Sequence, residues 1–129
     1  MASPLFIRTP ILSMVRPSGF TQTPLFTATA PTLIEKVSYN GGTSVPVETD
    51  AGRIRFLVND NDGNQGMYLD VAVPANDPAT DTLDVQGSVV LDLVLPIGWS
   101  LDVIVDLAVT GGAPNSQDLD FTTVGGELQ

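Results

Sequence analysis

Apolar residues recur at every second position along four segments of this chain, and this alternation constrains its fold more than any other feature. The segments are residues 53–58, 67–73, 89–95 and 99–109. Successive side chains of a β-strand point to opposite faces, so a period of two is typical of strands with one buried face. The sequence shows no helical period of useful length. It therefore predicts an all-β protein.

Shorter apolar stretches add further strands, and turn residues separate them. Residues 33–39, 44–48, 82–85 and 119–124 bring the expected total to about eight strands. The stretches "NGG" at 40–42, "PIG" at 96–98 and "TGGAPN" at 110–115 have the chemistry of turns. A chain of 129 residues has the length of one domain. We expect a single β-sandwich, with Ig-like and jelly-roll connectivity both open.

The alternation also predicts core side chains and one strand pairing. The expected core includes Phe56, Leu69, Leu93, Trp99, Leu101 and Val103. A three-residue turn at 96–98 would join the flanking strands in a hairpin, with Leu93 opposite Leu101 and Asp92 opposite Asp102. Opposed like charges are unfavourable. We therefore expect the two aspartates to form a solvated pair or to accept a partner's arginine.

The first 31 residues differ from the rest in having prolines at short intervals among large apolar residues. Pro4, Pro10, Pro17 and Pro24 exclude a stable helix. The expected organisation is an extended, proline-rich arm and linker over residues 1–31, followed by the sandwich over residues 32–129. The arm residues expected to bind a partner are Leu5, Phe6, Ile7, Arg8, Ile11, Leu12, Met14, Val15, Arg16 and Phe20. The alternative is that the arm folds back over its own sandwich.

Charge and composition exclude several classes of function. The net charge is −10, and residues 60–129 hold twelve acidic residues and no cation, which disfavours nucleic-acid binding. Histidine and cysteine are absent, so the chain has no thiol nucleophile, no imidazole or thiolate metal ligand and no histidine base. No segment has the apolar length of a membrane span or of a signal peptide. We expect a protein that is not an enzyme and binds no cofactor, metal, nucleic acid or membrane.

One polar stretch, residues 58–68, has a partial calcium-loop pattern. Asp60, Asp62 and Asn64 match the first three ligand positions of an EF-hand. Gln65 stands where glycine is needed, and Val71 stands where the bidentate glutamate belongs. The pattern therefore predicts a hairpin loop. Trp99, at the start of a strand, is expected to cap the core and not to bind sugar.

Four stretches of the chain carry a resemblance to a known family. They are "TLIEKVSYNGG", "GRIRFLVNDNDGNQGMYLDVAVP", "LDLVLPIGWSLDV" and "VGGEL". Together they resemble a family of small tailed-bacteriophage virion proteins, over about residues 32–128. The resemblance implies a structural role as a capsid decoration protein or another head- or tail-associated part. It implies no catalytic residues, and it does not cover the residues before position 24.

The expected function is that of a non-enzymatic capsid decoration, or cement, protein. We expect the arm to bind the major capsid protein or other virion proteins and so to stabilise the head lattice. The protein is expected to form a homo-oligomer, a trimer, and to reside in the virion after assembly in the host cytoplasm. One alternative is a tail, neck or baseplate component, and another is a carbohydrate- or receptor-binding module.

Overall fold

A computed structural model of the chain describes residues 7–17, 20–41, 48–77, 85–108 and 119–128. It has eight strands: β1 (Ile7–Val15), β2 (Thr23–Thr27), β3 (Thr32–Asn40), β4 (Gly52–Asn59), β5 (Gln65–Val73), β6 (Gln86–Leu95), β7 (Ser100–Asp106) and β8 (Asp120–Leu128). Within these ranges there is no helix that is long and apolar enough to cross a membrane. The all-β class expected from the alternation is confirmed.

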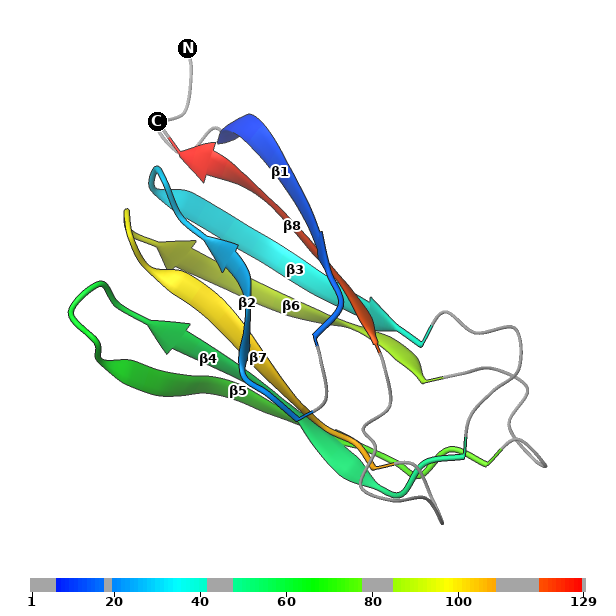
Figure 1. Cartoon of the computed structure of the whole chain (residues 1–129). Coiled ribbons are helices and arrows are strands. Elements are labelled where there is room, and N and C mark those ends of the chain that lie inside the picture. Colours follow the sequence, from blue (N-terminus) through cyan, green and yellow to red (C-terminus); the bar gives the residue numbers. More distant parts are fainter. Residues whose placement is uncertain (1–6, 18–19, 42–47, 78–84, 109–118, 129) are drawn as a thin grey trace.

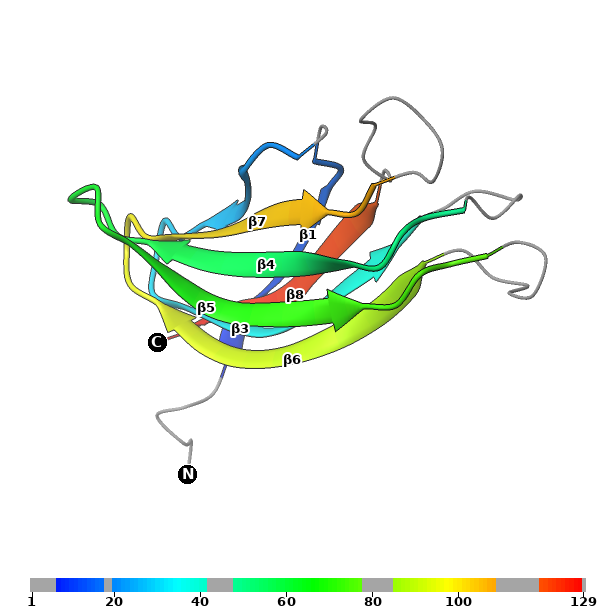
Figure 2. The ribbon, with the colours of Figure 1, turned by 90° about the horizontal axis from the view of Figure 1, so that it is seen from below.

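The strands form two antiparallel four-stranded sheets. Sheet A has the order β1-β8-β3-β6, and sheet B has the order β2-β7-β4-β5. Figure 1 shows the strands of each sheet side by side, and Figure 2 shows the two sheets layered against each other. The molecule is therefore a β-sandwich, as the sequence predicts.

The strand pairing decides between the two open connectivities. The first strand pairs with the last, β2 with β7, β3 with β6, and β4 with β5. The strands β1–β4 thus pair in reverse order with β5–β8, as in one long hairpin that is wound into two sheets. Such winding is the jelly roll with its two Greek keys, whereas an Ig-like sandwich divides its strands differently. The connectivity is that of a jelly roll.

The core lies between the two sheets and contains most of the side chains that the alternation placed there. Phe56, Leu101 and Val103 have no exposed surface. Leu69, Leu93 and Trp99 are half-buried and pack against the same cluster. Across the sheets, the rings of Phe56 and Phe121 meet edge to face with centroids 6.3 Å apart. The inward faces of the expected strands are thus confirmed.

The expected boundary between an arm and the sandwich at residue 32 is wrong. Residues 7–15 form β1, an edge strand that pairs with β8, and residues 23–27 form β2, an edge strand that pairs with β7. Pro10 and Pro24 fit these positions because an edge strand leaves alternate N–H groups unpaired. In its described part, the N-terminal segment therefore folds onto its own sandwich, which was the alternative interpretation.

The hairpin expected at residues 96–98 is also wrong, because β6 belongs to sheet A and β7 to sheet B. Leu93 lies opposite Ile34, and Leu101 lies opposite Phe26 and Val58. The turn crosses between the layers, where Gly98 N–H donates to Ala28 O at 2.8 Å. Asp92 and Asp102 therefore lie in different sheets and do not face each other.

The other expected strands have mixed outcomes. Residues 33–39 lie in β3, residues 119–124 overlap β8, and the four alternating segments correspond to β4, β5, β6 and β7. Residues 44–48 and 82–85 lie mainly outside the described residues.

Candidate interaction surface

The outer face of sheet A carries Leu12 and Met14, two exposed residues of the predicted partner-binding set. Because strand neighbours alternate between faces, the residues next to the buried ones on each strand point outward. The register across β1, β8, β3 and β6 arranges these outward residues in rows. The rows are Pro10–Gly126–Leu33–Val94, Leu12–Val124–Lys36–Val90, Met14–Thr122–Ser38–Ser88, and Asp120–Asn40–Gln86.

The first two rows make one half of this face apolar. We call Leu12, Leu33, Val90, Val94 and Val124 the apolar half. Leu12 is 69% exposed, Val90 is 71% exposed and Val94 is 51% exposed. Lys36 lies between Val124 and Val90, and its methylene stem adds apolar surface there. A sheet whose outer face is also apolar is normally covered by something else.

The last two rows form the polar half of the face. A shallow pocket of about 720 Å³ lies here, lined by Met14, Ser38, Tyr39, Asn40, Gln86, Gly87, Ser88, Asp120 and Thr122. All four strands of sheet A contribute to it, at the end where β3 finishes and β6 and β8 begin. The pocket is therefore built by the sheet itself.

An ion pair borders the polar half. Arg16 Nε donates to Asp120 Oδ1 at 2.8 Å, and a terminal guanidinium nitrogen donates to Oδ2 at 2.9 Å. The hydrogen bond from Arg16 lowers the pKa of the Asp120 carboxyl below its ordinary value. Both side chains are nearly half exposed, at 47% and 43%. Arg16 thus binds this chain's own carboxylate and ties the end of β1 to the start of β8.

The ten residues expected to bind a partner separate into groups. Leu5 and Phe6 lie outside the described residues, as do the side chains of Ile7 and Arg8. Ile11 and Val15 point inward and pack against the core. Leu12 and Met14 point outward from β1, and Phe20, between β1 and β2, is 38% exposed. Among the members of the set whose side chains the structure describes, Leu12, Met14 and Phe20 are the apolar ones that offer surface to a partner.

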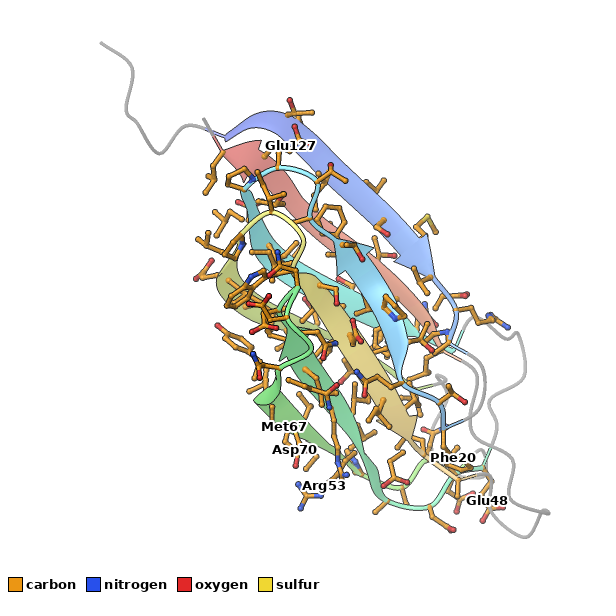
Figure 3. All side chains as sticks on the ribbon, turned by 60° about the vertical axis from the view of Figure 1, so that its left-hand side comes forward. Phe20, Glu48, Arg53, Met67, Asp70 and Glu127 are labelled. Atoms are coloured by element: carbon orange, nitrogen blue, oxygen red, sulfur yellow. The ribbon has the colours of Figure 1, made fainter. Side chains whose placement is uncertain are left out.

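The outer face of sheet B is polar by comparison. Arg53 donates to Asp70 at 2.9 Å, joining β4 to β5, and Figure 3 labels both residues. Asp102 is only 6% exposed. It accepts hydrogen bonds from Gln22 Nε2 at 2.8 Å, Asn59 Nδ2 at 2.6 Å and Ser100 Oγ at 2.8 Å. The expectation of a solvated aspartate or a partner's arginine at Asp102 is therefore wrong, because this chain's own side chains satisfy it.

The loop between β4 and β5 has the hairpin role that the sequence predicts. Asp60 Oδ1 accepts the N–H groups of Asp62 at 2.8 Å and Asn64 at 2.9 Å, and Oδ2 accepts Asn64 Nδ2 at 2.9 Å. These bonds, with that from the Asn64 side chain first, lower the pKa of Asp60. Within the described part of the chain no three acidic side chains gather as metal ligands. Asp60 organises the turn.

The sequence prediction missed the polar half of sheet A. Ser38, Gln86, Ser88 and Thr122 stand at outward positions of their strands, and this signal was available from parity alone. Their proximity was not available, because it depends on β3 lying between β8 and β6. The jelly-roll pairing brings together residues that are far apart in the chain.

No family model matches the sequence, and no curated protein matches it. Among solved structures, a chain of the T13 IBDV viral particle aligns with 94% of this chain at 16% identity and a TM-score of 0.40. A chain of infectious bursal disease virus Gt strain aligns with 94% at 17% identity and a TM-score of 0.36. This chain spans 32% and 30% of the length of those two chains. Both TM-scores are too low to establish a shared fold.

Proposed function

We propose that this protein is a non-enzymatic structural component of a virus particle that binds other virion proteins through the apolar half of sheet A. The single observation behind the proposal is the exposure of Leu12, Val90 and Val94 on the outside of a sheet whose inner face is already the core. The resemblance of residues 32–128 to small phage virion proteins supports the virion as its place. The absence of histidine and cysteine from the sequence supports a structural role.

The finer assignment is a capsid decoration protein that binds the major capsid protein as a homotrimer. Covering a large aliphatic side chain contributes up to about 1.5–3 kcal/mol, so a few such residues anchor a subunit that is repeated over a lattice. Arg16 already pairs with Asp120. Lys36 brings one charge into the rows of the apolar half. Attachment therefore depends mainly on apolar contact, and we expect only a small change with salt concentration.

Co-sedimentation with assembled capsids tests the proposed surface. The variant Val90→Ser removes one of the most exposed side chains of the apolar half, and Met67→Ser on β5 is the matched control because Met67 is 54% exposed in sheet B. We expect Val90→Ser to lower capsid occupancy several-fold and Met67→Ser to leave it unchanged. Equal binding by both variants would contradict the proposed surface.

Copy number per particle tests the finer assignment. A decoration protein covers the head lattice and is present in many copies, whereas a tail, neck or baseplate part is present in few. Quantitative mass spectrometry of purified particles gives this number. A low copy number would agree with a structural role but would assign the protein to the tail, neck or baseplate and not to the head.

A further inference from the structure

The pocket in the polar half of sheet A points to a second binding site, separate from the apolar half. We infer that this pocket binds a neutral polyhydroxylated ligand, a saccharide. The inference does not depend on the proposed virion role, because it uses other residues and a different chemistry.

The geometry of the pocket places hydrogen-bonding groups side by side. Thr122 on β8, Ser38 on β3 and Ser88 on β6 are direct neighbours across the sheet. The next row brings Asn40 beside Gln86. Because adjacent strands lie about 4.8 Å apart, the row of three hydroxyls spans roughly 10 Å, which is longer than one sugar ring and matches a disaccharide or a longer saccharide.

Four of the lining groups have no hydrogen-bond partner among the described residues. The structure gives the side chains of Ser38, Gln86, Ser88 and Thr122 no hydrogen bond to any described residue. Each hydroxyl both donates and accepts, and the amide of Gln86 does so with separate atoms. Sugar hydroxyls have the same double capacity, so the two sets of groups match without any charge.

Charge at the pocket disfavours ionic ligands. Asp120 is the acidic residue of the lining, and Arg16 holds both of its oxygens. The two charges cancel, so the residues that line the pocket present no unpaired cation to a phosphate or carboxylate and no unpaired anion to an amine. Met14, 72% exposed, adds an apolar wall for the C–H face of a sugar ring.

Tyr39 and Gly87 complete the floor of the pocket. The Tyr39 hydroxyl lies directly over Gly87, where a Cβ would overlap it. The Tyr39 ring lies on the inner face of sheet A, against Phe121 and the core, so the ligand would meet the outward side chains of the lining and not this phenol. The pocket volume of about 720 Å³ falls within the range of small-molecule sites. Because the pocket is shallow, we expect weak binding that is strengthened when several copies meet a polymeric ligand.

Saturation-transfer NMR on the full chain tests the inference. The probes are glucose, galactose, mannose, N-acetylglucosamine, maltose and lactose, with inorganic phosphate as the anionic comparison. We expect saturation transfer to at least one neutral sugar and no competition by phosphate. Dextran pull-down distinguishes a polymeric source from a free sugar, and binding in either form supports the inference.

Two variants and a control make the test specific. Thr122→Val and Gln86→Leu replace polar groups by near-isosteric apolar ones, and Thr27→Val is the control because Thr27 is exposed on β2 of sheet B. We expect each pocket variant to weaken saturation transfer several-fold with an unchanged melting temperature, and the control to have no effect. Absence of transfer to every sugar and to dextran, transfer that the pocket variants do not reduce, or displacement by phosphate would overturn the inference.

Discussion

At the scale of single residues, the Arg16–Asp120 pair links two strands that are separated by most of the chain. Both side chains are nearly half exposed, and solvent screens such pairs, so the contribution to stability is less than about 1 kcal/mol. The pair nevertheless has a definite pH dependence, because folding lowers the pKa of Asp120.

The first prediction concerns this pH dependence. Since the folded-state pKa of Asp120 is depressed, the stabilisation is complete above the unfolded-state value of about 3.9 and is lost as pH falls through the folded-state pKa. We expect Arg16→Gln to lower the free energy of unfolding slightly at neutral pH, and the difference from the wild type to vanish in acid. Urea denaturation over a pH series measures this. A difference that persists unchanged in acid would exclude the pair as its source.

A second prediction concerns Gly125, a buried residue of β8 between β1 and β3. A Cβ at this position would overlap the carbonyl oxygen of Leu33. We expect Gly125→Ala to destabilise the protein by about 1–3 kcal/mol or more, since overpacking a fixed backbone is costly. At Gly66 a Cβ would meet no atom within 4 Å, so Gly66→Ala is the matched control. Similar melting temperatures for the two variants would contradict this placement of β8.

At the scale of elements, the sequence predicts strands well where one face is buried and the other is polar. Leu101 illustrates this, because the polar residues Ser100 and Asp102 flank it in sequence and it is fully buried. The strand β1 escaped prediction because Pro10 and the outward residues Leu12 and Met14 obscure its alternation. Its inward residues, Ile11 and Val15, do follow a period of two if Ser13 is included.

Pairing between elements was harder to predict than the elements themselves. The turn at 96–98 has the length of a hairpin turn, yet it crosses from sheet A to sheet B. The number of residues between two strands gives the length of their connection. It does not tell in which of the two sheets the second strand lies. For the same reason the row Thr122–Ser38–Ser88 was not foreseen, since its three residues come from strands that are not consecutive in the chain.

The third prediction tests the two faces of β1. Ile11 packs against the core, whereas Leu12, its neighbour in sequence, is 69% exposed. A fully buried isoleucine costs about 2–5 kcal/mol when truncated to alanine, so the half-buried Ile11 should cost roughly half of that. Leu12→Ala should change stability by no more than about 0.5 kcal/mol. Chemical denaturation of the two variants makes the comparison, and equal losses would mean that residues 7–15 do not form this strand.

At the scale of the whole molecule, the jelly roll pairs the first described strand with the last. Deleting residues 2–23 would remove β1, leave β8 as an edge and take away the Ile11 and Val15 contacts with the core. We expect the truncated chain to lose cooperative unfolding, as measured by circular dichroism and by the dispersion of its amide NMR signals. A well-dispersed spectrum from the truncated chain would show that the remaining residues fold alone, as the arm interpretation holds.

The pairing of Ile7 with Leu128 also determines how the molecule responds to mechanical force. Handles at the two chain ends would pull on adjacent ends of the antiparallel strands β1 and β8. The hydrogen bonds between these strands would therefore break one after another. Handles at Thr9 and Thr122 would pull the same two strands past each other and load many bonds together. We expect optical tweezers to record a much lower unfolding force in the first geometry, and equal forces would contradict the pairing. A subunit tethered only by its ends would therefore yield under loads that it resists when held across its sheet.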